Sequence, residues 1–156
     1  MDFFLENFDP DLRALNTLGV RYRRLASRDQ FQAYLQYYGR KVQEKAGAER
    51  GERAGTIWAE ALRIYQQLGD ETHAQESAAR ALACAPDNFR VHYAIGSWLL
   101  DRGQFPEAEE HLQWCSQRKP TDEQLKQKLE AAVKGRVDGT QQTASAPSGD
   151  GRAVRY

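Results

Sequence analysis

Residues capable of catalysis or metal binding are few in this chain and are scattered along it. His73, His92 and His111 lie far apart and in no HxxxH or HExxH pattern, the spacing that brings two imidazoles to one metal ion. Cys84 and Cys115 belong to no CxxC pair and to no Cys/His ligand spacing. The glycines form neither a GxGxxG nor a GxxxxGK phosphate-binding loop. The sequence therefore predicts no catalytic residues, no metal site and no cofactor, and we expect that the protein is not an enzyme.

The elements that would position functional side chains are organised by a repeat of 34 residues. Between residues 55 and 121, positions 34 apart pair Trp58 with His92, Tyr65 with Leu99, Gly69 with Gly103, Ala74 with Ala108, Ala81 with Cys115, and Pro86 with Pro120. Internal repeats of this length are typical of arrays in which one supersecondary unit stacks on the next. The sequence therefore predicts an architecture before it predicts an activity.

Each copy of the repeat has the pattern of two helices joined by a tight turn. In the first copy, one helical face carries Trp58, Ala61, Leu62 and Tyr65, and a second carries Ala74, Ala78, Ala81 and Leu82. Gly69 is expected to end the first helix in a left-handed conformation, Asp70 to cap the second, and Pro86 to stop it. In the second copy the stripes are His92, Ile95, Gly96 and Leu99, then Ala108, Leu112 and Cys115. The small side chains favour close packing of each pair.

These residues resemble the tetratricopeptide repeat. The match runs as Trp58, Tyr65, Gly69, Ala74, Ala81 and Pro86, then Ile95-Gly96, Leu99, Gly103, Ala108, Cys115 and Pro120, and covers roughly residues 55 to 134 with a following helix. Two positions depart from the family: Ala61-Leu62 replaces its Leu-Gly, and His92 replaces a packing aromatic, so His92 is expected at the edge of the core. The resemblance implies an all-α fold, a right-handed superhelical array of helical hairpins. An ordinary helical bundle is the alternative.

The resemblance also implies a binding groove, because in the family the first helix of each repeat lines a concave surface that holds a peptide. The matching positions here are Thr56, Ala59, Arg63, Gln66 and Gln67, then Arg90, Tyr93, Ser97, Leu100 and Asp101. Arg63 and Arg90 are candidates for holding a carboxylate, and Tyr93 and Leu100 for apolar contact. Two solvated arginines are the alternative. The Lys and Asn pattern that clamps a C-terminal carboxylate in some family members is absent, so a chaperone-tail receptor is not expected.

Trp114 falls at a position that the repeat normally leaves on the convex surface, with Glu110 and Arg118 one turn to either side. An exposed tryptophan predicts a contact surface, and its replacement by alanine would then weaken partner capture or self-association. Two alternatives remain open: Arg118 stacks on the indole, or the C-terminal helix covers it.

The flanking segments are expected to support the repeats. Residues 1–54 are predicted to be an N-terminal helical pair, either a cap or a degenerate repeat, with a helix start at Asp9-Pro10-Asp11 and a capping box formed by Ser27 and Gln30. The run 47–55, GAERGERAG, is expected to be a loop or an extension of the next helix. The apolar residues Phe3, Phe4, Leu5 and Phe8 are expected to dock on the chain's own helices, with insertion into a partner as the alternative.

The C-terminal part is predicted in two pieces. Thr121-Asp122-Glu123 begins a capping helix that completes the unit 55–134, and residues 135–156 are expected to be a disordered tail because they offer little to bury.

Composition narrows the function without naming a partner. The formal net charge is zero, so no global field favours nucleic acid, although Arg21, Arg23, Arg24 and Arg28 form a basic cluster that keeps this as a minor alternative. Unpaired cysteines and the lack of a signal peptide or a membrane-spanning run favour a cytoplasmic location. We expect a non-catalytic adaptor or scaffold that binds a protein partner in the groove. The alternative is a structural subunit that assembles, or forms a homo-oligomer, through Trp114 and the apolar N-terminus.

Overall fold

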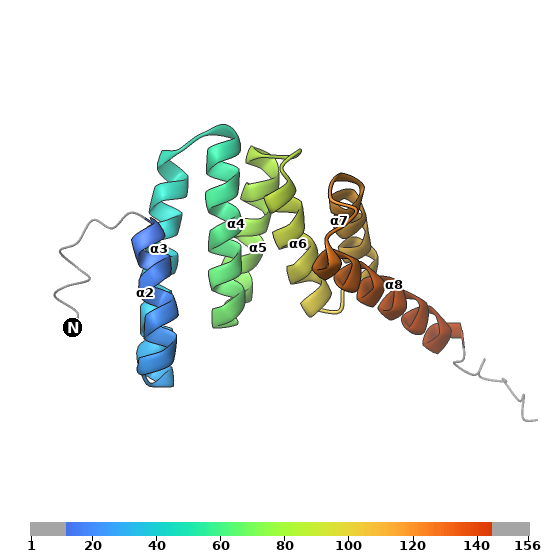
Figure 1. The fold of residues 1–156 in the computed structure, drawn as a ribbon, viewed down its shortest axis with the longest axis horizontal. Helices are drawn as coiled ribbons and strands as arrows, with labels where there is room; N and C mark the ends of the chain where they lie inside the picture. Colours follow the sequence, from blue (N-terminus) through green and yellow to red (C-terminus); the bar gives the residue numbers. More distant parts are fainter. Residues whose placement is uncertain (1–11, 145–156) are drawn as a thin grey trace, which may run out of the picture.

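A computed structural model describes residues 12–144, and this range is all helical, with no strand in it (Figure 1). Its helices are α2 (Leu12–Leu25), α3 (Arg28–Ala48), α4 (Gly51–Leu68), α5 (Glu71–Cys84), α6 (Phe89–Asp101), α7 (Phe105–Arg118) and α8 (Glu123–Ala144). The prediction of an all-α fold is confirmed for this part of the chain. None of the helices described is both long and apolar enough to cross a membrane.

The turns between these helices use the residues that the sequence singled out. Gly69 and Gly103, which are equivalent in the two copies, have left-handed φ values of 70° and 73°, a region that glycine enters without steric cost. The Asp70 carboxylate accepts a hydrogen bond from the His73 backbone N–H at 3.1 Å and so caps α5. Ser27 and Gln30 form the expected capping box at the start of α3.

The helices pack as two hairpins that lie side by side. Helix α4 packs against α5 and α6 against α7, while α4 also contacts α6, and α8 contacts both α6 and α7. The segments around Trp58 and His92 are therefore neighbours in space as well as equivalents in sequence. A continuous core runs through both copies and includes the fully buried side chains of Leu62, Leu112 and Cys115.

In each copy, one of two equivalent positions on the paired helices carries a large side chain and the other a small one. A β-carbon at Gly96 of α6 would lie 2.9 Å from Cγ of Leu112 on α7, so only glycine fits beneath this leucine. The equivalent positions in the first copy are Leu62 and Ala78, both in the core, and their sizes are reversed. The departure of Ala61-Leu62 from the family pattern thus coincides with a compensating small residue on the facing helix.

The N-terminal pair joins the array differently from the two copies. Helix α3 packs against α4, but α2 packs only against α3 within the described range. A hollow separates α2 from α4, lined by Gly19 and Val20 on one side and by Ile64 and Gln67 on the other. Because α2 does not reach α4, the pair does not repeat the contact that α4 makes with α6.

One predicted alternative is confirmed and one boundary needs correction. Within the run 47–55, residues 51–55 extend the next helix, since α4 begins at Gly51, and Gly55 is buried inside it against Ala85, where a β-carbon would clash. The first part of the segment expected to be a disordered tail, 135–144, belongs to α8. Gly135 lies against the ring of Phe105, and Arg136 pairs with Glu109 of α7, contacts that support the helix there.

Helix α8 starts at Glu123, within the predicted start 121–123, and the Asp122 carboxylate accepts a hydrogen bond from the Leu125 backbone N–H. The expected helix start at 9–11, the apolar residues 3–8 and the remainder of the tail, 145–156, lie outside the described residues.

Gly96→Ala is expected to lower the free energy of unfolding by about 1–3 kcal/mol, because the added methyl group overpacks the contact with Leu112. Urea unfolding measures the change. In a double-mutant cycle, Leu112→Ala should cost less in the Gly96→Ala background than in the natural sequence.

Gly47→Ala is the matched control, because Gly47 is helical in α3 and a β-carbon there has no neighbour within 4 Å. This change should leave stability unchanged or raise it by up to about 1 kcal/mol. Equal effects of the two glycine substitutions would contradict the packing argument.

Candidate functional site

The candidate site is a groove of about 500 Å³ formed by α4, α6 and α8. Helices α4 and α6 are the first helices of the two hairpins, and α8 continues the row. The groove is lined by Ala59, Glu60, Arg63, Gln66, Arg90, Tyr93, Ala94, Ser97, Asp101 and Lys128. We refer to this set as the first-helix groove.

Seven of the ten residues matched to the repeat register come together in this groove: Ala59, Arg63, Gln66, Arg90, Tyr93, Ser97 and Asp101. Thr56, Gln67 and Leu100 do not line it. Gln67 faces the hollow between α2 and α4, because one residue further along a helix is about 100° further around it. Leu100 is half-buried and packs against the core, which is where an aliphatic side chain loses the most apolar surface to water.

The first charged pair in the groove is an ion pair between Arg63 and Glu60 of the protein itself. Arg63 Nε donates to Glu60 at 3.1 Å, and the Tyr38 hydroxyl of α3 donates to the same carboxylate at 3.1 Å. Burial, together with the charge of Glu60, raises the pKa of Tyr38 and keeps its hydroxyl a donor. Arg63 is therefore paired with Glu60, and its role in holding a ligand carboxylate stays a prediction.

A second polar contact joins the two copies across the groove. The Gln66 side-chain amide of α4 donates to the Asp101 carboxylate at the end of α6. This hydrogen bond engages the negative charge of Asp101 and links the C-terminal ends of the two first helices.

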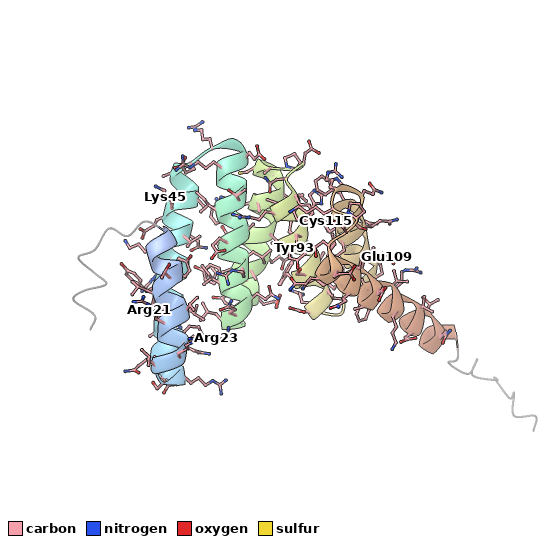
Figure 2. All side chains as sticks on the ribbon, viewed as in Figure 1. Arg21, Arg23, Lys45, Tyr93, Glu109 and Cys115 are labelled. Atoms are coloured by element: carbon pink, nitrogen blue, oxygen red, sulfur yellow. The ribbon has the colours of Figure 1, made fainter. Side chains whose placement is uncertain are left out.

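The cations on the α6 and α8 side of the groove are not neutralised in this way. Arg90 and Lys128 form no ion pair with any carboxylate in the described part of the chain. The Lys128 ammonium lies 5.6 Å from the centre of the Tyr93 ring, within the range of a cation–π contact. Tyr93 also stacks on Phe89, with ring centroids 6.1 Å apart. Two cations and an aromatic ring therefore share one side of the groove (Figure 2 labels Tyr93).

Sequence reasoning missed Lys128, because the lysines of the last helix look like an ordinary solvent-exposed face. Its position, three residues after the core residue Leu125, puts it on a face that contacts α6. Only the contact between α8 and α6 makes it a groove residue.

Two histidines meet between α6 and α7, where the sequence placed them far apart. Nε2 of His92 donates to the carbonyl oxygen of Pro86 at 2.6 Å, since a carbonyl can only accept. Nδ1 of His92 lies 2.9 Å from Nδ1 of His111, so that one imidazole donates a hydrogen bond to the other. His92 is buried, as expected for a residue at the core edge.

Trp114 lies in a stack rather than on an open surface. Its ring is parallel to that of His92, with centroids 3.9 Å apart, and the Arg118 guanidinium lies 3.2 Å from the ring centre on α7. The indole is half-buried. Arg118 stacking was one of the two alternatives to a contact surface, and it describes the observed geometry.

The chemistry-bearing side chains that the structure describes do not converge on a metal-binding group of three or more His, Cys, Asp or Glu. Cys84 and Cys115 are free thiols. Burial raises the pKa of Cys115 to about 11, which keeps it protonated and unreactive at neutral pH. The exposed cluster Arg21, Arg23, Arg24 and Arg28 has members on different sides of α2, as Arg21 and Arg23 show in Figure 2.

No protein-family model matches the chain, and neither does any curated protein. The functional argument consequently rests on the geometry of the groove and on its charges.

Lowering the pH from 7 to 5 is expected to destabilise the fold through His111. Burial and the neighbouring His92 lower the pKa of His111, against a smaller opposing effect of Glu110. As the pH falls, the unfolded chain, in which His111 has its usual pKa of 6.5, takes up the proton first, so the free energy of unfolding decreases. Urea unfolding at several pH values should show a flatter dependence for His111→Gln. Identical slopes would refute this assignment.

Trp114→Ala is expected to lower the free energy of unfolding by about 1–3 kcal/mol, because it removes a half-buried aromatic side chain and two stacking contacts. Thermal unfolding followed by circular dichroism measures this. Gln113→Ala, an exposed change on the same helix, should stay within about 0.5 kcal/mol of the natural protein. A Trp114→Ala variant as stable as that control would mean that the stack contributes nothing.

Proposed function

We propose that this chain is a tetratricopeptide-like adaptor or scaffold that binds a segment of a partner protein in the first-helix groove. The observation that carries the proposal is that α4, α6 and α8 line one groove containing seven residues that were selected from the repeat register alone. A preformed groove of packed helices accepts an extended segment or a helix at little ordering cost to itself.

The charge distribution specifies the kind of segment. Glu60 and Asp101 are engaged by Arg63 and Gln66, whereas Arg90 and Lys128 have no carboxylate partner among the described residues. A partner side chain with a carboxylate would complement these two cations, and an apolar or aromatic neighbour would contact Tyr93. The proposal is therefore a groove for an acidic segment, with binding and no catalysis.

The right-handed superhelical arrangement of the hairpins belongs to the same proposal, as does a cytoplasmic location. Two equivalent hairpins related by 34 residues, with α4 beside α6 and α6 beside α8, support the former. The free thiols of Cys84 and Cys115 support a reducing compartment for the latter.

Charge reversal in the groove tests the binding role. The double variant Arg90→Glu, Lys128→Glu is expected to recover at least about tenfold less of the partner proteins that the natural chain captures, since like charges replace a complementary pair. Lys134→Glu is the matched control, because it makes the same change on the exposed part of α8. Affinity capture with quantitative mass spectrometry gives the comparison, and titration of a peptide from the captured protein gives the affinity. Equal recovery by all three proteins would overturn the groove assignment.

A structural subunit is the second candidate. The exposed side chains of Leu25, 88% accessible, and Val20, 60% accessible, leave apolar surface on α2 that an assembled partner copy would cover. Light scattering over a range of concentrations separates the two candidates, because a monomer at all concentrations favours the groove.

A further inference from the structure

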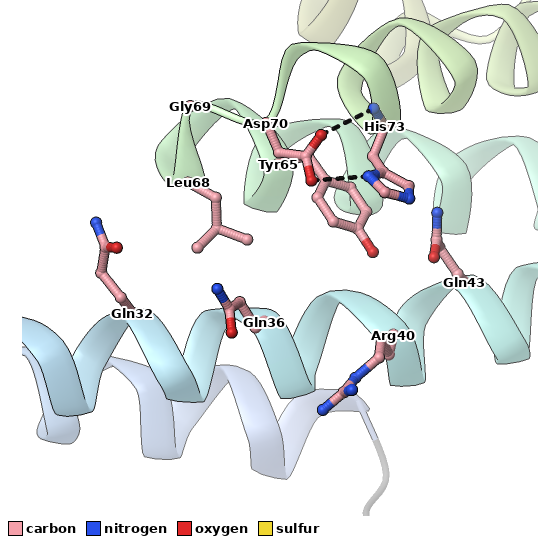
Figure 3. A pocket seen from close by; sticks show the side chains of 9 residues that line it. All are labelled: Gln32, Gln36, Arg40, Gln43, Tyr65, Leu68, Gly69, Asp70 and His73. Carbon is pink, nitrogen blue, oxygen red and sulfur yellow. Dashed lines mark hydrogen bonds and ion pairs between the residues drawn. The ribbon is translucent and has the colours of Figure 1, made fainter.

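A second hollow, separate from the first-helix groove, lies between α3 and the junction of α4 with α5 (Figure 3). It has a volume of about 500 Å³. One wall is a stripe of α3 that carries Gln32, Gln36, Arg40 and Gln43, and the other carries Tyr65, Leu68 and the start of α5. We refer to this hollow as the polar cleft.

The polar cleft and the first-helix groove use opposite faces of α4. Leu68 lines the cleft and Ala59 lines the groove. They are nine residues apart in the sequence, or about two and a half helical turns. A ligand in one therefore does not touch the other, and the two sites are testable separately.

The carboxamides along α3 are spaced like the peptide groups of an extended chain. Gln32 and Gln36 are four residues apart on a helix, a rise of about 6 Å, and two residues of a β-strand span about 6.6 Å. From Gln32 to Gln43 the rise is about 16.5 Å, the length of about five strand residues. Each carboxamide offers both a donor and an acceptor, as a peptide group does.

The polar cleft contains one arginine, Arg40, and one carboxylate, Asp70, which do not pair with each other. Arg40 forms no ion pair with any described residue. The cleft's carboxylate, Asp70, is already engaged by His73, through the backbone N–H at 3.1 Å and ring Nδ1 at 2.7 Å. The guanidinium of Arg40 is thus the charge left for a ligand to complement.

We propose that the polar cleft binds an extended acidic segment of a partner protein, with its main chain on the carboxamides of Gln32, Gln36 and Gln43 and a carboxylate side chain on Arg40. The Tyr65 ring and Leu68 on the facing wall supply apolar contact along the segment. This site does not depend on the first-helix groove.

Selection from a displayed library of random nine-residue peptides, with the full-length chain immobilised, tests this proposal. Three forms of the chain are compared: the natural sequence, Arg40→Gln, and Arg90→Gln as the control that makes the same change in the first-helix groove. The natural chain and Arg90→Gln should both enrich peptides with an acidic residue that Arg40→Gln fails to enrich. A synthetic peptide from that set should bind Arg40→Gln about tenfold more weakly.

Nuclear magnetic resonance places the synthetic peptide on the surface. Binding should shift the backbone amides of Gln36 and Gly69 and leave those of Arg90 and Ser97 unchanged, and Gln36→Ala should weaken it. The proposal would be overturned if no peptides were enriched or if the enriched peptides lacked acidic residues. It would also be overturned if the synthetic peptide bound Arg40→Gln as tightly as the natural chain, or if it shifted only amides of the first-helix groove. Arg40 is exposed and without an ion pair among the described residues, so unfolding curves of Arg40→Gln should match those of the natural chain.

Discussion

The fit between the two helices of each hairpin is the constraint on which the rest of the structure depends. Gly96 makes room for Leu112 in one copy, and the equivalent core positions in the other copy, Leu62 and Ala78, have the sizes reversed. Interiors pack at crystal-like density, so one large and one small side chain at such a contact set the separation of the helix axes. That separation lets α4, α6 and α8 form one row, and the groove is the surface of this row.

Ion pairs and hydrogen bonds to charged side chains are distributed unevenly between the sides of the groove. On the α4 side, Glu60 is shared by Arg63 and Tyr38, and Gln66 donates to Asp101 at the end of α6. These contacts tie both carboxylates to neighbouring side chains of the protein. The opposite side keeps the charges of Arg90 and Lys128 without carboxylate partners in the described range, next to an aromatic ring. Unpaired cations on one side of the groove would favour one orientation of a bound acidic segment.

The two proposed binding sites are lined by helix faces rather than by loops. Because each connection is only a few residues long, the loops serve mainly to reverse the chain, and Gly69 and Gly103 do this with positive φ values. A helix in such a row has two accessible faces, and α4 uses one for the groove and the other for the polar cleft. Another helix face is used for packing between α6 and α7, where His92 contacts both His111 and Trp114.

The sequence by itself determined the helices, their caps and the register of the two copies, because these follow from neighbouring residues and a 34-residue period. Ser27, Gly69 and Asp70 act as their local chemistry predicts, and the same repeat register selected seven residues of the groove. Only the tertiary structure decided that Gly55 lies inside a helix against Ala85, that Lys128 reaches the groove, and that His92 meets His111. Each of these depends on which distant segment lies opposite a residue, and that is fixed by packing between helices rather than by local conformational preference.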